Sequence, residues 1–213
     1  MLDKVMALKN RKVNILGYDE MTKAAVLIPL RQEEDELVIL FEKRALHLKR
    51  QPGDICFPGG RLEPGDQHPS QAAVRETCEE LGVSPEDVQI LAPLDVFVTH
   101  YNGFIYPYVG LISREAEFSP NEEVEEIFTI PLSFFMHTEP ERFDVTLTVE
   151  PPDDFPFHRI VGGRNYGWRK GYIPEYFYSY EGYDIWGLTA RILVHFVQLL
   201  KRQEQIPLET GAK

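Results

Sequence analysis

The chain has 213 residues, which is enough for one domain with a sizeable buried core. Its hydrophobic fraction of 43% and charged fraction of 26% are typical of a soluble globular protein. The formal net charge of −12 argues against general nucleic-acid binding, which needs a basic surface.

The first residues lack the apolar core of a signal peptide, and no uncharged apolar run approaches the ~18 residues that a membrane span needs. We therefore expect a cytoplasmic protein that does not bind membranes. The two cysteines, Cys56 and Cys78, cannot form a disulfide framework and have no Cys or His partners at metal-binding spacing. They are predicted to be small buried residues.

The first predicted elements form a β-hairpin after a polar lead-in over residues 1–21. Two apolar runs, 23–30 and 36–44, flank the acidic turn RQEED, which is a hairpin pattern. The next stretch, 45–68, contains three Pro-Gly pairs and is predicted to be a series of turns.

Residues 69–81 are predicted to form a helix, because Pro69 suits its first turn and Gly82 suits the left-handed position after its end. Its apolar stripe consists of Ala73, Val74, Thr77, Cys78 and Leu81. The glutamates of this helix are expected on the opposite face, pointing away from the core toward solvent or a cleft.

More strands and a last helix are predicted downstream. The strand-like stretches cover residues 88–99, 104–112, 125–132, 143–150 and 157–162. A helix is predicted over 184–203, with a core-facing stripe of Ile185, Leu188, Ile192, Phe196 and Leu199. Because strands outnumber the two distant helices, we expect an α/β fold with a mixed sheet between helices. We predict a single domain over 22–203 and a C-terminal tail over 204–213.

The helix over 69–81 carries three acids at positions where local physics disfavours them. Glu76, Glu79 and Glu80 lie at i, i+3 and i+4, where each like-charge pair destabilises a helix by roughly 0.2–0.5 kcal/mol. Glu79 and Glu80 also lie near the negative end of the helix dipole. A solvated acidic face is one interpretation. The other is a divalent cation such as Mg²⁺, which takes oxygen ligands and bridges carboxylates to substrate phosphates.

The same residues resemble a known motif. Gly60, Asp66 and the run RETCEELGV over 75–83 are similar to the Nudix box, which is Gly, five residues, Glu, seven residues, then Arg-Glu-U-x-Glu-Glu-x-Gly-U, where U is apolar. Asp66 stands in place of Glu, eight residues rather than seven precede Arg75, and Thr77 occupies an apolar position.

The extra residue and the Asp are similar to the coenzyme A pyrophosphatase branch of the Nudix hydrolases. An upstream stretch also resembles that branch's signature: LFEKRA over 40–45, then Lys49, Gly53 and FPGG over 57–60. Lys49 replaces an Arg of the signature, and Phe41-Glu42 replaces Leu-Thr. Together with NEEVEEIFTIPLSFF and YDIWGLTARIL, the resemblance spans roughly residues 24–200.

The resemblance implies a Nudix-type α/β/α sandwich that uses Mg²⁺ or Mn²⁺ to hydrolyse a small nucleotide substrate. In the coenzyme A branch the products are 3′-phosphoadenosine 5′-phosphate and 4′-phosphopantetheine. ADP-ribose, NADH and dinucleoside polyphosphates are the alternative substrates. A Nudix module that senses a nucleotide without cleaving it is the alternative outside catalysis. Homodimers are frequent in this family, so a homodimer is also considered.

The resemblance also assigns metal-site roles. Glu76 and Glu80 are expected as direct ligands, and Glu79 as a ligand or a partner through bound water. The Gly60 carbonyl is a further candidate ligand, and the backbone of Gly59 and Gly60 is expected to approach the substrate. Arg75 either orients Glu79 or forms an ordinary helix ion pair. Asp66 either anchors the loop or starts the helix.

For the general base there are two alternatives: a metal-bound hydroxide suffices without a base, or a distal glutamate accepts the proton, for which Glu123 is the candidate. A solvated acidic turn over 122–126 is the alternative for Glu123. Arg44 and Lys49 are expected to bind the anionic substrate, together with the neighbouring Lys43 and Arg50. A second basic stretch consists of Arg159, Arg164, Arg169 and Lys170.

Four aromatics either stack on adenine or pack in the core: Tyr101, Phe104, Tyr166 and Trp168. His100 and His195 are predicted to be structural.

Overall fold

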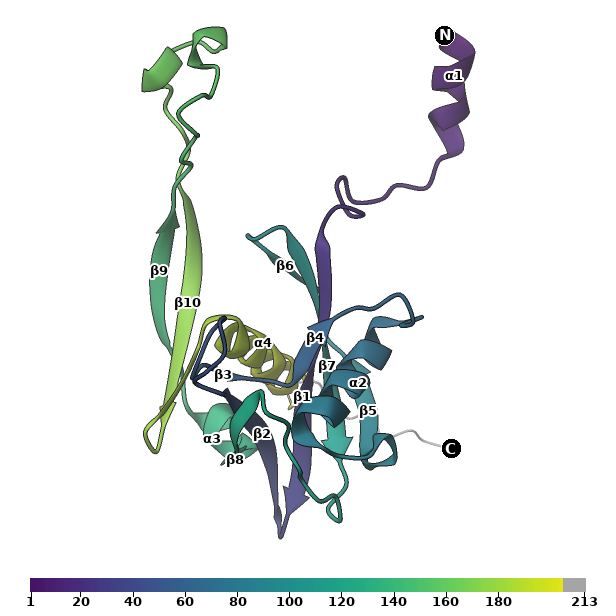
Figure 1. Ribbon diagram of the computed structural model, residues 1–213, viewed down its shortest axis with the longest axis vertical. Coiled ribbons are helices and arrows are strands. Elements are labelled where there is room, and N and C mark those ends of the chain that lie inside the picture. The colour runs from purple at the N-terminus through teal and green to yellow at the C-terminus, as the bar shows by residue number, and fades with distance from the viewer. Residues whose placement is uncertain (205–213) are drawn as a thin grey trace.

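The structure, a computed structural model, describes residues 1–204. It contains two sheets and four α-helices (Figure 1). The first sheet consists of β1 (Thr22–Glu33), β2 (Glu36–Arg44), β3 (Ile55–Cys56), β4 (Gly59–Arg61), β5 (Val88–Pro93), β6 (Phe97–Thr99), β7 (Gly103–Ile112) and β8 (Val124–Pro131). The second consists of β9 (Glu141–Leu147), β10 (Gly171–Tyr180) and β11 (Tyr183–Trp186). The helices are α1 (Leu2–Met6), α2 (Pro69–Leu81), α3 (Leu132–His137) and α4 (Gly187–Glu204).

The first sheet is mixed, as predicted. Its main path runs β3-β2-β1-β7-β5, with β4 paired to β1, β6 to β7 and β8 to β2. The central pair, β1 and β7, is parallel, whereas the other pairs in this sheet are antiparallel. Parallel strands need a long crossover connection, and the chain between β1 and β7 contains α2.

Helices cover both faces of this sheet, so the fold is an α/β/α sandwich. Successive side chains of a strand point to opposite faces, and β1 is apolar on both. Ala25 and Leu27 pack in the cluster that contains α2. Ile28 and Leu30 pack in the other cluster, with α3 and α4. Figure 1 shows α2 and α4 on opposite sides of β1.

The predicted hairpin and the helix boundaries at 69–81 are confirmed. Pro69 opens α2 and Gly82 follows it with a φ of +68°, the left-handed conformation that glycine tolerates. The N-cap is His68, whose ring accepts a hydrogen bond from the Ser70 N–H while the Gln71 side chain accepts one from the His68 N–H.

Three downstream predictions are wrong in part. The strand predicted over 88–99 is two strands, β5 and β6, because the pairing shifts register between Ile90 and Ala92 and Pro93 offers no N–H. The strand predicted over 157–162 is a 3₁₀ turn (Phe157–Arg159) followed by Gly162 with a φ of +91°.

The last helix begins at Gly187 rather than at residue 184. Residues 183–186 instead form β11, which pairs with β10, a strand that the sequence pattern did not predict. Ile185 of the predicted stripe therefore lies on a strand, although its side chain is buried as expected.

The second sheet forms an arm that extends from the body (Figure 1). Its inner face joins the core through Tyr178 and Ile185. At its outer end lies the connection between β9 and β10, residues 148–170.

The polar lead-in contains α1 and a 3₁₀ turn (Ala7–Asn10), and residues 1–16 are exposed. Among residues 1–204, no helix combines the length and apolar character needed to cross a membrane. Of the tail predicted over 204–213, residues 205–213 lie outside the described residues.

Candidate active site

The site is built where the Gly59-Gly60 pair, which was predicted to be a turn but lies on strand β4, meets the α2 helix. Gly59 and Gly60 lie on β4 and pair with Val26 and Ala25 of β1. A Cβ at Gly59 would collide with the backbone of Ala25, and a Cβ at Gly60 would collide with the Glu76 carboxylate. Gly59 therefore has no room for a side chain between the two backbones, and a side chain at Gly60 would displace the Glu76 carboxylate.

Glu80 lies inside the protein rather than on an outward acidic face, so the predicted orientation is wrong for this residue. Its side chain is 6% exposed, and its Oε2 accepts a 2.8 Å hydrogen bond from the Gly59 N–H. The reason is helical spacing: Glu80 follows Ala73 by seven residues and Thr77 by three, so it shares their buried stripe. Glu76 lies at the edge of that stripe, while the side chain of Glu79 is 56% exposed.

A second buried carboxylate, Glu42, was missed by sequence analysis. It is 1% exposed on β2, and its Oε1 accepts a 3.1 Å hydrogen bond from the thiol of Cys56. Its Oε2 is buried and has no hydrogen-bond partner among residues 1–204. The sequence did contain a signal, because side chains two residues apart on a strand share a face. Glu42 follows Leu40 by two residues, and Leu40 packs in the α2 cluster. A charge at that position in an apolar strand faces α2.

The environment of these carboxyls disfavours their ionised forms. Burial raises the pKa of both Glu42 and Glu80 well above the ordinary value. Repulsion from Glu123 and Glu76 adds to the shift of Glu42, and repulsion from Glu42 and Glu76 adds to that of Glu80. Burial also raises the pKa of Glu76, although Arg75 opposes that shift. The site therefore resists holding three negative charges unless a cation lies nearby.

Arg75 organises the rim of the site. Its guanidinium donates to Glu76 Oε1 at 2.8 Å and to the Arg61 carbonyl at 3.1 Å, and lies 3.6 Å from Glu79 Oε2. The predicted pairing with Glu79 is present, but Glu76 is the closer partner.

Asp66 anchors the loop before α2, which was one of its two predicted roles. Its Oδ2 accepts hydrogen bonds from the Glu63 N–H at 2.8 Å and from Arg75 at 3.3 Å. It does not start the helix, because His68 is the N-cap.

The donor set suits a hard divalent cation, since carboxylate oxygens are the ligands that Mg²⁺ and Mn²⁺ prefer. The unpartnered Oε2 of Glu42 is consistent with a missing positive partner. Among residues 1–204, however, no three Asp, Glu, His or Cys side chains converge as a metal-binding group. Glu76 is held by Arg75 and Glu80 by Gly59, so these two side chains have to turn to share an ion.

Two other predicted residues lie next to Glu42. Arg44 follows it on β2, and its guanidinium lies 3.9 Å from Glu123 Oε2. Glu123 is held there because its carbonyl accepts a 2.8 Å hydrogen bond from the Ala45 N–H. Its carboxylate is half exposed, and its charge raises the pKa of Glu42. Lys49 is exposed on the bend after β2, and the structure gives it no defined role.

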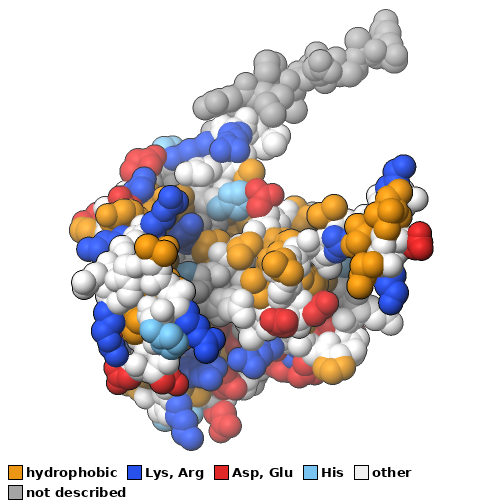
Figure 2. Space-filling view, turned by 90° about the horizontal axis from the view of Figure 1, so that it is seen from above, with side chains coloured by type: hydrophobic (Ala, Val, Ile, Leu, Met, Phe, Trp, Pro, Cys, Tyr) orange, Lys and Arg blue, Asp and Glu red, His pale blue; other side chains and the backbone are white. Residues whose placement is uncertain are grey.

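The second basic stretch is not part of this site within one chain. Arg159, Arg164, Arg169 and Lys170 belong to the connection at the outer end of the arm, away from α2 (Figure 1). From above, Lys and Arg side chains gather over that end (Figure 2). Tyr166 and Trp168 pack against each other there, at 4.9 Å between ring centroids.

The remaining aromatics and histidines also lie outside the carboxylate group. Phe104 is a core residue, and Tyr101 is exposed between β6 and β7. His195 lies 3.2 Å from Asp95, and the ring of His100 lies against that of Tyr101. Both cysteines are free and half-buried.

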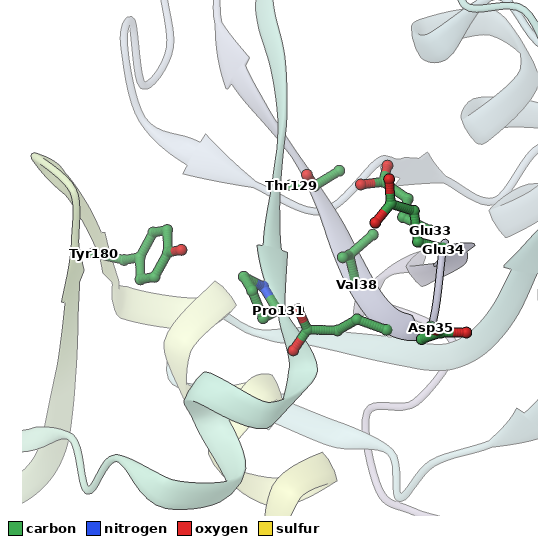
Figure 3. Close-up of a pocket in the computed structure, with 8 residues that line it drawn as sticks. Glu33, Glu34, Asp35, Val38, Thr129, Pro131 and Tyr180 are labelled. Atoms are coloured by element: carbon green, nitrogen blue, oxygen red, sulfur yellow. The ribbon is translucent and has the colours of Figure 1, made fainter.

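A separate cleft of about 530 Å³ lies beside the β1–β2 turn, and Figure 3 shows Tyr180 across it from the carboxylates of Glu33 and Glu34. Its acids lie on an exposed hairpin turn, and it lacks the buried carboxylates and the Gly59-Gly60 pair. We therefore place the candidate active site at α2 and not in this cleft.

Comparisons with known proteins match the part of the chain that contains this site. A family model described as "NUDIX domain" matches residues 21–147. The chain is 37% identical over 116 residues to "Peroxisomal coenzyme A diphosphatase NUDT7" of Mus musculus, a match that covers 54% of this chain and 49% of that protein. It is 31% identical over 210 residues to "Nudix hydrolase 3" of Caenorhabditis elegans, covering 93% of this chain and 81% of that protein.

The chain thus spans about half the length of the mouse relative. Among solved structures, a MutT/nudix family protein from Enterococcus faecalis matches with a TM-score of 0.46 at 16% identity, covering 97% of this chain and 72% of that chain.

Proposed function

Because the chain belongs to the NUDIX domain family, we propose that it is a pyrophosphohydrolase that cleaves coenzyme A or one of its derivatives. The products would be 3′-phosphoadenosine 5′-phosphate and 4′-phosphopantetheine. The observation that carries the proposal is the set of carboxylates held against the Gly59-Gly60 pair of β4, with Glu80 bonded to the Gly59 N–H. The substrate assignment is supported by the upstream stretch from Leu40 to Gly60 and by the printed name of the mouse relative.

We assign a divalent cation, Mg²⁺ or Mn²⁺, to Glu76 and Glu80, with Glu79 acting directly or through water. The Gly60 carbonyl is a further candidate ligand. Glu42 is added as a carboxylate that faces the same site. When bound, such an ion lowers the pKa of water and neutralises charge on phosphate oxygens.

The chain's own groups have separate tasks in this proposal. Arg75 keeps Glu76 and Glu79 in position. Arg44 and Lys49 bind phosphate oxygens, and the Gly59 and Gly60 backbone allows the substrate to approach closely. Glu123 takes the proton from the attacking water, because its carboxylate is accessible to solvent.

The proposal is tested by incubating the purified chain with coenzyme A, ADP-ribose, NADH and a dinucleoside polyphosphate, each with Mg²⁺, with Mn²⁺ or with a chelator. We expect 3′-phosphoadenosine 5′-phosphate from coenzyme A, and no product with the chelator. Cleavage of another member of the panel alone would contradict the substrate assignment. If calorimetry detects nucleotide binding without product over hours, a sensing function replaces hydrolysis.

A conservative change at Glu42 tests whether this buried carboxylate belongs to the metal site. We expect Glu42→Gln to weaken Mn²⁺ binding by about 10–100-fold, the range seen when a group that supports metal ligands is removed. Titration of the folded protein with Mn²⁺, followed by electron paramagnetic resonance of the free ion, measures this directly. Glu33→Gln is the matched control, since Glu33 is an exposed carboxylate on the same hairpin. Equal affinity of the two variants would exclude Glu42 from the site.

Two expectations stay predictions. The first is a cytoplasmic location; the mouse relative is named as peroxisomal, and imaging of a tagged chain distinguishes the two compartments. The second is a homodimer.

A further inference from the structure

We propose that the outer edge of β9 is an interface between two copies of this chain, in which the two β9 strands pair antiparallel about Phe143. The second sheet runs β11-β10-β9, so among residues 1–204 strand β9 has one neighbour, β10. Figure 1 shows β9 on the outside of the molecule, beyond β10. Residues 141–146 are all exposed. A strand edge of this kind presents unpaired N–H and C=O groups to another chain.

The charges of β9 are self-complementary in one register. Two copies of one strand pair antiparallel about a two-fold axis perpendicular to the sheet, which leaves each side chain on its own face. Because residues directly opposite each other share a face, the axis must pass between the two copies of a single residue. Centring on Phe143 places Arg142 opposite the partner's Asp144, and Asp144 opposite the partner's Arg142. Centring on Arg142 or on Asp144 places like charges opposite each other, which is destabilising.

The same register continues an aromatic row across both copies. On the outer face, Phe143 packs edge-on against Phe177 at 5.7 Å, and Phe177 stacks on Trp186 at 5.9 Å. Phe143 is 53% exposed at the end of this row. Pairing about Phe143 brings the two copies of this ring together, and cross-strand aromatic pairs stabilise a sheet.

The core covers the inner face of the arm toward β11, whereas on β9 this face carries Arg142 and Asp144, which lie opposite Tyr176 and Pro174 of β10. Tyr178 and Ile185 are buried in the core, and Tyr176 and Tyr180 pack against it. Arg142 and Asp144 form a 3.0 Å ion pair within one chain, with both side chains more than half exposed. In the dimer each of them gains a second partner of opposite charge. The paired sheets would have six strands.

The test is a charge swap measured by analytical ultracentrifugation over a concentration series. We expect a dimer for the wild type, and at least about tenfold weaker dimerisation for Arg142→Glu and for Asp144→Arg, since each places like charges opposite each other. The double variant Arg142→Glu/Asp144→Arg restores opposite charges and is expected to restore the dimer. Arg202→Glu, the same change at an exposed position of α4, is the control and should dimerise like the wild type.

Cysteine cross-linking tests the register separately. Opposite Cβ atoms lie about 4.5–5.5 Å apart, so Phe143→Cys is expected to form an intermolecular disulfide on mild oxidation. Val145→Cys is the control, because four residue steps of ~3.4 Å separate the two copies of residue 145 in this register.

A wild type that stays monomeric up to its solubility limit would overturn the interface. So would single charge variants that dimerise like the wild type, or cross-linking at residue 145 instead of 143. None of these outcomes depends on hydrolysis, so they leave the proposed function unaffected.

Discussion

Glu80→Gln is expected to reduce kcat by more than about a hundredfold while making the folded protein more stable in the absence of metal. The loss follows because the substitution removes a carboxylate assigned to the divalent cation. The gain follows because glutamine keeps an oxygen that can accept the Gly59 N–H and removes a carboxyl whose ionised form is disfavoured by burial and by the neighbouring Glu42. We expect the free energy of unfolding in chelator to rise by about 1 kcal/mol.

Steady-state hydrolysis and urea unfolding measure the two effects. Glu79→Gln is the matched control, because it removes a carboxylate from the same helix at a half-exposed position. We expect a smaller loss of activity, less than about tenfold, with no gain in stability. If Glu80→Gln lost activity and stability together, Glu80 would be a structural residue, and full activity would exclude it from the site.

Phe41→Ala is expected to lower the free energy of unfolding by about 3–5 kcal/mol, the usual loss when a buried phenylalanine is truncated. Phe41 is completely buried on the face of β2 opposite Glu42. Its ring lies 5.1 Å from Phe57, 5.7 Å from Phe128 and 5.9 Å from Phe135. Truncation therefore leaves a cavity between the sheet, the segment before Gly59 and α3.

Urea unfolding monitored by circular dichroism measures the loss, and an unchanged m-value would show that the unfolded state is not altered. Tyr172→Ala, at a position 68% exposed on β10, is the comparison and should change stability by less than about 0.5 kcal/mol. A loss below about 1.5 kcal/mol for Phe41→Ala would mean that the surrounding rings collapse into the space.

Much of the site region was predictable from the sequence. The ends of α2 follow from Pro69 and Gly82, and the β1–β2 hairpin follows from two apolar runs around an acidic turn. Both depend on residues close together in the chain, so the pattern contains the necessary information. The order of Arg75, Glu76, Glu79 and Glu80 on the helix follows in the same way.

The arm was the part of the fold that the pattern did not predict. β9 was expected with its end three residues too late, and β10 and β11 were missed. The partners β9 and β10 are separated by residues 148–170, so no short turn marks them as a hairpin. Pro174 within β10 also weakens the strand pattern there.

By itself, therefore, the sequence determined which acids share the α2 helix, where that helix begins and ends, and that a Gly-Gly pair precedes it; the turn predicted at this pair is strand β4 in the structure. Only the tertiary structure decided that Glu80 faces inward onto Gly59 and that Glu42 reaches the same place from β2. The physical reason is that these contacts depend on how α2 packs across the sheet. Helical and strand spacing place Glu80 and Glu42 on the buried faces of α2 and β2, but only packing brings the two carboxylates together beside Gly59.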